Sequence, residues 1–388
     1  MAFKVVIIGS GPHGLITATN LLRRLNHDEI RIVDPNEMFG AKLLDHMTDC
    51  ATLHLRSGET EHVDAVHSSL ADFAERSHRT SGFARGRRPC VKLWFDHLQD
   101  TAERLRLTEC RYQAWGTAIR RKGKLLEVVT TSGTLEAESV VLAMGQMRPF
   151  YPEWAARLRG HWPHVMHVFD NDFDGLNLPV VEHAIVVGGG ITAAQTVARV
   201  AQNGTQRITY LTRRPLSKGE GVTSTLDWRD NQELCQKLCS LELPSQRDDM
   251  LRAEGDRGTI PQWELERLEQ LQSEERVIHE VCSISHAIPT SQNVRVALDN
   301  GIVLGANQLV LATGFTPELQ DWLVASARAL GLPFYPDGVP LLERDFEWGR
   351  GSNIFLTGIH ARRIAGPYAH NVVGAQMFAS QFCARRWK

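Results

Sequence analysis

Two glycine-rich stretches have the residue types and the spacing that bind dinucleotides. Between a buried strand and a helix, such a turn brings bare backbone and the N-terminus of the helix against a pyrophosphate. Two such turns in one chain therefore predict two bound dinucleotides. The first stretch, GSGPHG, supplies Gly9, Gly11, Pro12, His13 and Gly14, and the second, GGGITA, supplies Gly188, Gly190 and Ala193.

The first turn is followed by an acidic residue at the distance that ribose binding requires. Residues 3–8 are a β-branched run typical of a buried parallel strand, and residues 14–24 have helical apolar spacing. A second β-rich run, EIRIVDP, contains Asp34 at its end, 20 residues past Gly14. A carboxylate there accepts hydrogen bonds from an adenine-side ribose and repels a 2′-phosphate. We predict FAD or NAD at this turn, with a purely structural glycine turn as the alternative.

The second turn has basic residues at the corresponding strand end. Its second strand, RITYLTRRP, leads into Arg213 and Arg214. Planar guanidinium groups suit a 2′-phosphate, so this turn is predicted to bind NADPH. The alternative is a solvated, charged corner. Ala193 stands where the last glycine of the motif would be, and alanine still permits close packing of helix on strand.

Two further runs resemble each other and bracket the second turn. SVVLAMG ends at Gly145 and QLVLATG ends at Gly314, and each is a buried strand that ends in small residues, as expected where the chain crosses between nucleotide domains. We predict an α/β fold of two Rossmann-like dinucleotide-binding domains, with the NADPH domain inserted into the FAD domain. The predicted division is 1–177 for the first part of the FAD domain, 178–310 for the inserted NAD(P)H domain, and 311–388 for the second part of the FAD domain.

The C-terminal stretch returns to the first domain. A strand near residues 353–356 is followed by Gly358, and a glycine and proline pair leads into a helix from about Asn371. A helix N-terminus behind a returning strand suits the carbonyl edge of an isoalloxazine, which becomes anionic on reduction. A plain C-terminal docking helix is the alternative.

Composition excludes several classes of protein. A formal net charge of -2 offers no field to gather nucleic acid or an anionic membrane, so we predict neither partner. The N-terminal apolar run of residues 5–8 is too short for a signal peptide, which predicts a cytoplasmic chain. The seven cysteines form no disulfide framework, and Cys235 and Cys239 have no partner pair at ligand spacing, so no metal site is predicted. The chain contains no CxxC, which argues against a flavin enzyme that reduces through a disulfide.

These motifs together resemble the two-dinucleotide flavoprotein oxidoreductases, and within them the NADPH-dependent flavin monooxygenases (class B) and the amine N-hydroxylases. The resemblance covers almost the whole chain, through GSGPHG, LHLRS, VLAMG, GGGITA, LATGFTP and GPYAHNVVGA. It implies FAD in the outer domain and NADPH in the inserted one. It also implies that NADPH reduces the flavin, that O₂ adds to form a C4a-(hydro)peroxyflavin, and that one oxygen passes to a nitrogen or sulfur of a small-molecule substrate.

The chain departs from the family at two places. Many such monooxygenases have an asparagine after the LRS run, where this chain has Gly58, and a family histidine is matched by either His164 or His167. From the resemblance we predict Arg56 near the flavin or the nicotinamide and Asn371 as a donor toward the flavin edge.

Several alternatives remain open at this stage. One is an NADPH-dependent reductase that passes electrons to a quinone or a protein, and another is a non-catalytic redox sensor that binds both nucleotides. The long segment 219–261 suits a lid or substrate wall, or else a surface excursion or oligomer contact, and a homo-oligomer is left open.

Overall fold

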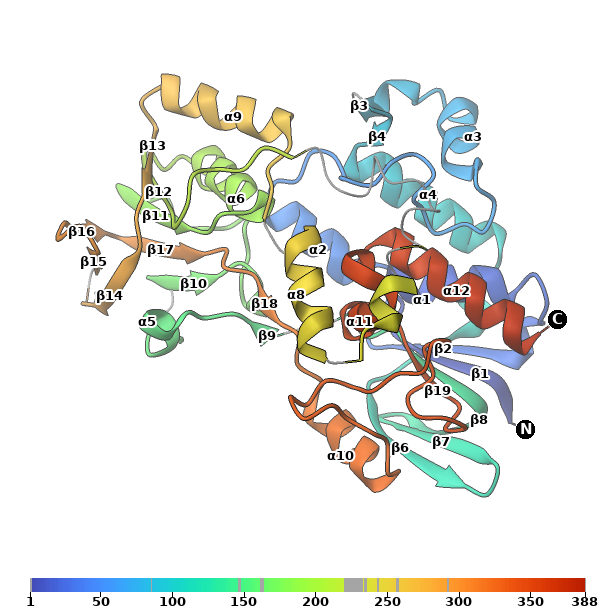
Figure 1. The fold of residues 1–388 in the computed structure, drawn as a ribbon. Coiled ribbons are helices and arrows are strands. Elements are labelled where there is room, and N and C mark those ends of the chain that lie inside the picture. Colours follow the sequence, from blue (N-terminus) through green and yellow to red (C-terminus); the bar gives the residue numbers. More distant parts are fainter. Residues whose placement is uncertain are drawn as a thin grey trace.

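The computed structural model describes residues 2–84, 86–145, 148–160, 164–219, 233, 236–242, 244–255, 258–291 and 293–387. Two α/β domains lie side by side, each built on its own sheet (Figure 1). Among the described helices, none is long and apolar enough to cross a membrane.

The first domain is built on a seven-stranded sheet of order β5-β2-β1-β8-β7-β6, with β19 also paired to β8. β1 runs parallel to both neighbours, with Val6 opposite Arg31 on β2 and Val140 on β8. Helices cover this parallel part, so its β-branched residues are buried on both faces. The strands are β1 (Phe3–Ile8), β2 (Ile30–Asp34), β5 (Arg111–Gln113), β6 (Gly116–Lys122), β7 (Leu125–Thr130), β8 (Gly133–Leu142) and β19 (Ile354–Leu356).

The helices of the first domain pack around one hydrophobic core. The first and last helices, α1 and α12, lie against each other, so the C-terminal segment closes the domain that the N-terminus begins (Figure 1). A small hairpin of β3 (Phe83–Ala84) and β4 (Arg88–Pro89) precedes α4. The helices are α1 (Pro12–Leu21), α2 (Ala41–Asp49), α3 (Ser69–Arg76), α4 (Val91–Arg104), α10 (Asp321–Ala329), α11 (Arg362–Ala365) and α12 (Val372–Arg386), with short 3₁₀ turns at 27–29, 80–82, 107–110, 359–361 and 366–368.

The second domain has a fully parallel sheet of order β10-β17-β11-β12-β13. Helices α6 (Ile191–Gln202) and α9 (Gln262–Ser273) pack on one face, and α5 (Glu153–Ala156) packs on a smaller antiparallel sheet, β14-β15-β16. The strands are β10 (Val165–His167), β11 (His183–Val187), β12 (Arg207–Thr212), β13 (Val277–Val281), β14 (Ile284–Pro289), β15 (Val294–Leu298), β16 (Val303–Ala306) and β17 (Gln308–Leu311).

The second sheet takes in a strand that precedes the predicted start of the inserted domain. β10 pairs with β17 through Val165 opposite Leu309, although it lies before residue 178. The sheet of the second domain thus begins at residue 165, and the domain boundaries given above stay a prediction.

The chain crosses between the domains at two neighbouring places. β9 (Arg148–Pro149) leads toward the second domain, β18 (Phe315–Thr316) leads back, and the two pair antiparallel. The ring of Phe315 stacks on Phe169 with centroids 4.3 Å apart. The two crossings therefore form one paired connection.

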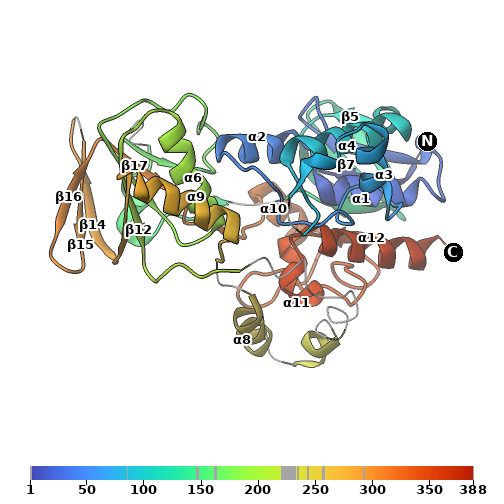
Figure 2. The same ribbon diagram turned by 90° about the horizontal axis from the view of Figure 1, so that it is seen from above.

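Helix α8 (Pro244–Gly255) belongs to the long segment after β12 but packs on the first domain, beside α11 (Figure 2). Arg363 on α11, only 5% exposed, forms ion pairs of 2.5 Å with Asp248 on α8 and with Asp337. These ion pairs anchor the charged helix to the first domain.

Candidate functional site

The first glycine turn has the backbone geometry of a phosphate cradle. Gly9 has φ +109°, and a Cβ there would lie 2.3 Å from the carbonyl oxygen of Ala143 on the strand end of β8. A Cβ on Gly14 would lie 1.9 Å from the carbonyl oxygen of Gly9, so α1 packs directly on the turn. Gly11, by contrast, has no described atom within 4 Å of its Cβ position, and it precedes Pro12 at the start of α1. Backbone atoms thus pack closely against Gly9 and Gly14, whereas the space beside Gly11 at the start of α1 is open.

Asp34 lies at the end of β2 beside this turn, with its carboxylate fixed in place. Its Oδ2 accepts a hydrogen bond from the Ser10 amide at 2.7 Å, and its Oδ1 accepts from the amide and side chain of Asn36, both at 2.9 Å. Each carboxylate oxygen has a second lone pair, so the group can still accept from a hydroxyl. This position and orientation support the predicted role in binding a ribose.

His13 links the start of α1 to the end of β19. Its Nδ1 lies 2.7 Å from Thr357 Oγ1, and its ring lies beside the backbone of His370 and Asn371. Burial lowers the pKa of His13 to about 4, so the imidazole is neutral at pH 7, and its buried Nε2 has no hydrogen-bond partner among the described residues. Gly358, with φ +85°, turns the chain immediately after Thr357.

Asn371 is the N-cap residue of α12. Its side chain makes no capping hydrogen bond within the described part of the chain. The first amides of the 15-residue helix therefore remain available as donors. The starts of α1 and α12 meet around His13, so the fold brings Asn371 beside the first glycine turn.

In the second glycine turn, as in the first, backbone packs closely against the first glycine. Gly188 has φ +154°, and a Cβ there would lie 2.3 Å from the Ala312 carbonyl oxygen and 2.9 Å from Ala193, which is fully buried. Gly190 precedes α6 as its N-cap. Unlike Gly11, Gly190 is covered, because the Cα of Gly258 lies 3.7 Å from its Cβ position.

Arg213 and Arg214 follow β12 at the edge that carries this turn. Both residues are exposed, and the Thr212 hydroxyl donates to the Arg214 carbonyl at 2.8 Å, which fixes the corner. Two exposed guanidinium groups at this strand end fit a 2′-phosphate, so the predicted role stays a prediction with suitable geometry.

Gly145 and Gly314 lie at the two crossings, with φ of +63° and +84°. The carbonyl of Gly314 accepts a hydrogen bond of 2.9 Å from Phe150, and Gly145 directly precedes residues outside the described ranges. Of the two family histidines, His167 is buried on β10 with Nε2 at 3.2 Å from Thr313 Oγ1, next to the crossing, whereas His164 contacts the Asn307 carbonyl at 2.9 Å. His167 is therefore the one placed at the connection between domains.

Arg56 reaches from the first domain into the segment after β12. Its Nη2 donates to Thr259 Oγ1 at 2.7 Å and to the Gly219 carbonyl at 3.4 Å, and its Nη1 donates to the Thr259 carbonyl at 3.3 Å. These are contacts between domains, made to residues that the sequence pattern did not connect with Arg56.

Glu61, in the same loop as Arg56, is a buried acid that the sequence did not single out. It is 6% exposed, and burial raises the pKa of its carboxyl to about 7 against hydrogen bonds from Ser57 and the Gly58 backbone. Gln376 on α12 donates to the Thr60 carbonyl at 3.0 Å, which ties this loop to the helix that begins at Asn371. Burial of a single acid depends on the tertiary structure, so no local signal marked it.

Gly58 has open space on the side where a side chain would project. No described atom lies within 4 Å of its Cβ position, so the missing asparagine of the family is not replaced there by another described side chain in contact range. The open space adjoins the loop that carries both Arg56 and Glu61.

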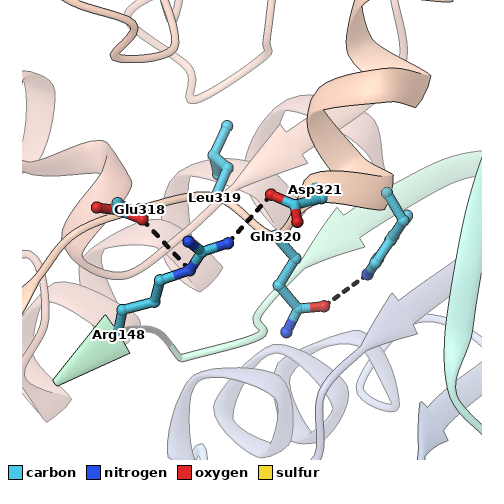
Figure 3. Close-up of a pocket in the computed structure, with 6 residues that line it drawn as sticks. Arg148, Glu318, Leu319, Gln320 and Asp321 are labelled. Carbon is cyan, nitrogen blue, oxygen red and sulfur yellow. Dashed lines mark hydrogen bonds and ion pairs between the residues drawn. The ribbon is translucent and has the colours of Figure 1, made fainter. Parts of the chain in front are cut away.

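A pocket of about 380 Å³ lies where the second crossing enters α10 (Figure 3). The Arg148 guanidinium lies between Glu318, at 3.3 Å, and Asp321, at 3.1 Å (Figure 3). All three side chains are largely exposed, and the pocket contains none of the glycine positions.

The two domains also meet away from the crossings, at the end of α2. Arg199 on α6 donates to the Asp49 carbonyl at 3.1 Å, Arg267 on α9 donates to the Ala51 carbonyl at 3.1 Å, and Thr52 donates to Gln195 at 3.1 Å. These contacts join α6 and α9 to the first domain.

Comparison with protein families identifies a model described as pyridine nucleotide-disulphide oxidoreductase, which matches residues 3–227. No curated protein matches the chain significantly in sequence.

Several solved structures share the fold over nearly the whole length. An ornithine N-hydroxylase from Kutzneria sp. 744, solved with reduced FAD, NADP⁺ and L-ornithine, is 17% identical with a TM-score of 0.77, and 99% of each chain is covered. L-lysine 6-monooxygenase from Pseudomonas syringae is 18% identical with a TM-score of 0.78, covering 99% of this chain and 98% of the other. A bacillithiol disulfide reductase from Staphylococcus aureus is 14% identical with a TM-score of 0.61 over 100% of each chain. The predicted fold of two nucleotide-binding domains is confirmed.

Proposed function

The chain belongs to the pyridine nucleotide-disulphide oxidoreductase family, and on that premise we propose that it is an FAD-dependent, NADPH-reduced monooxygenase acting on a nitrogen or sulfur of a small molecule. The observation that carries the proposal is the first cradle. Its open Gly11, the fixed Asp34 carboxylate and the start of α12 converge on one edge of the sheet, where an extended flavin dinucleotide has a partner for each of its parts.

Each residue of the first cradle has a distinct task in this proposal. FAD, when bound, supplies hydride acceptance and oxygen activation, and the protein supplies position, charge and exclusion of water. Gly11 allows the pyrophosphate to approach the amides at the start of α1, and Asp34 accepts from the ribose. Asn371 and the first amides of α12 donate toward the flavin edge, and the positive end of that helix favours developing negative charge there.

The second cradle suits the hydride donor. Gly188 and Ala193 shape the turn, Gly190 offers the helix start to a pyrophosphate, and Arg213 and Arg214 bind the 2′-phosphate that distinguishes NADPH from NADH. The contacts between α2 and the second domain hold this turn in a fixed relation to the first.

A nitrogen of a small amine is our first choice of substrate. The Kutzneria and Pseudomonas syringae proteins that share the fold are named for ornithine and lysine, and a third neighbour, from Erwinia amylovora, is described as a cadaverine monooxygenase bound to FAD. The anchored α8 lies over the C-terminal loops of the first domain, where it forms one wall of the substrate site in this proposal.

A second candidate is an NADPH-dependent reductase that passes electrons to an external acceptor. The bare Gly58 favours it, because the loop lacks the side chain that monooxygenases of this kind place there. A reductase that works through its own Cys-x-x-Cys pair is not supported, since the sequence contains none.

The test is oxygen uptake and product analysis with purified protein. We expect a yellow protein that is bleached by NADPH and that hydroxylates ornithine, lysine, cadaverine or a related amine or sulfide, with oxygen uptake stimulated by that compound. Reduction by NADPH with hydrogen peroxide as the sole oxygen product, together with fast transfer to a quinone, supports the reductase. A protein that does not bind FAD contradicts both.

A further inference from the structure

The two cradles differ in one respect that their sequences do not reveal. At Gly11 the space before the helix start is open to 4 Å within the described structure. At Gly190, the equivalent position of the second turn, the Cα of Gly258 lies 3.7 Å from the Cβ position, so Gly258 packs against the turn. The packing is close enough that a Cβ on Gly258 would lie 2.9 Å from the Gly190 Cα and 3.3 Å from its amide nitrogen. A pyrophosphate must reach that amide, so Gly258 stands in its way.

Gly258 belongs to a short paired structure that we call the insertion stem, residues 217–219 and 258–260. The Ile260 amide donates to the Ser217 carbonyl at 2.8 Å, and the Gly219 amide donates to the Ile260 carbonyl at 3.0 Å. These bonds join the two ends of the segment after β12 in front of the second turn. Ile260 is fully buried, which seats the stem on the second domain.

The stem is also held from the other domain, by Arg56. Its guanidinium donates to both Thr259 oxygens and to the Gly219 carbonyl, which gives two contacts on one side of the stem and one on the other. Arg88, which is 3% exposed, donates to the backbone carbonyl of Arg56 and lies over the ring of Trp263 on α9, 5.4 Å from its centroid. The arginine that holds the stem is therefore itself supported from both domains.

We propose that Arg56 is a positioning residue that holds the insertion stem over the second cradle, so that NADP(H) binds only when the stem moves away from Gly190. The proposal rests on the proposed function, because it takes the second turn as the NADPH site. In this role Arg56 lowers the affinity for NADP(H), whereas an arginine in direct contact with the nicotinamide nucleotide would raise it. If Arg56 stabilises the covered state, its removal raises the fraction of molecules that can bind, and the apparent dissociation constant falls in proportion.

The decisive measurement is NADP⁺ affinity of the FAD-loaded full chain, by calorimetric titration, for wild type and Arg56→Ala. We expect Arg56→Ala to bind NADP⁺ about tenfold more tightly, equivalent to about 1.4 kcal/mol. Thr259→Val, which removes the closest acceptor at 2.7 Å, is expected to change affinity in the same direction by a smaller factor. Arg87→Ala is the matched control, because Arg87 lies near the same loop but pairs with Glu59 and not with the stem.

Gly258→Ala provides a variant that is independent of Arg56. Its Cβ cannot fit against Gly190, so the stem is forced off the turn and NADP⁺ affinity rises. Weaker or unchanged affinity in Arg56→Ala, with Arg87→Ala unchanged, overturns the inference and supports contact of Arg56 with the nucleotide. NADP⁺ binding by the wild type, together with the predicted rise in NADP⁺ affinity in Arg56→Ala, supports the inference, whatever the identity of the oxygenated substrate. If no variant, wild type included, binds NADP⁺ while FAD is retained, the assignment of the second turn fails and the inference fails with it.

Discussion

Two glycines of the first turn, three residues apart, are expected to respond in opposite ways to the same substitution. Gly11 has φ −71° and ψ −177°, which alanine adopts without strain, and its Cβ position is free of described atoms within 4 Å. Gly11→Ala is therefore expected to fold with wild-type stability or to gain up to about 1 kcal/mol from the restricted unfolded chain. Its methyl group projects into the open front of the cradle, where the pyrophosphate must approach.

Gly14→Ala has the opposite profile. Alanine is about 1 kcal/mol better than glycine inside a helix. Here, however, the new Cβ would lie 1.9 Å from the Gly9 carbonyl oxygen, about 1.5 Å short of ordinary contact, and this oxygen belongs to the backbone and cannot rotate away. Forcing such an overlap costs about 3 kcal/mol or more, which outweighs the gain in helix propensity.

The two variants are separated by one pair of measurements. The urea midpoint of the FAD-free protein, followed by tryptophan fluorescence, is expected to be unchanged for Gly11→Ala and clearly lower for Gly14→Ala. FAD affinity, from titration of the FAD-free protein, is expected to fall about tenfold to a hundredfold for Gly11→Ala, the value of one or two lost charge-assisted hydrogen bonds. Wild-type FAD affinity in Gly11→Ala refutes the assignment of this turn to the flavin.

Three further outcomes follow from the described groups. Arg213→Ala with Arg214→Ala is expected to lower kcat/KM for NADPH about tenfold to a hundredfold with little change for NADH, and equal losses contradict the 2′-phosphate assignment. Glu61→Gln is expected to stabilise the protein by up to about 3 kcal/mol at pH 8 and by much less at pH 5 in urea unfolding, because a carboxyl whose pKa is raised to about 7 costs stability as it ionises in the fold; no pH dependence of the gain sinks this reasoning. Burial lowers the pKa of His97 to about 3, so the neutral side chain contributes fully to stability above pH 6.5, and this contribution is lost as the pH falls. His97→Gln is therefore expected to reduce the difference in unfolding free energy between pH 7 and pH 5 by about 2 kcal/mol. An unchanged dependence of stability on acid pH in this variant speaks against the reasoning.

Local sequence was sufficient for the parts of the site that one strand, turn and helix define. The packing of Gly14 on Gly9 and the placement of Asp34 beside Ser10 depend on residues within one βαβ unit, and the positions of these residues in a glycine turn and at a strand end were predicted from spacing. The close approach of Gly9 to Ala143, by contrast, depends on a distant strand. A C-terminal strand that returns to the first domain was also predicted, although its pairing with β8 was not.

Features that join distant segments were not predictable from the pattern. Arg56 and Thr259 are 203 positions apart, and nothing in either neighbourhood specifies the other. Gly258 was not singled out, because it lies in a polar stretch that reads as a loop, although its lack of a side chain is what lets the stem touch Gly190. Cys235, considered with Cys239 for a metal site, lies outside the described residues.

The paired crossing of β9 and β18 has a mechanical consequence. The pairing of the two strands and the stacked rings beside them join the two crossings into one connection. A hinge motion between two domains is absorbed by a few residues in the segments that connect them. The two connections between the domains therefore cannot bend independently of each other.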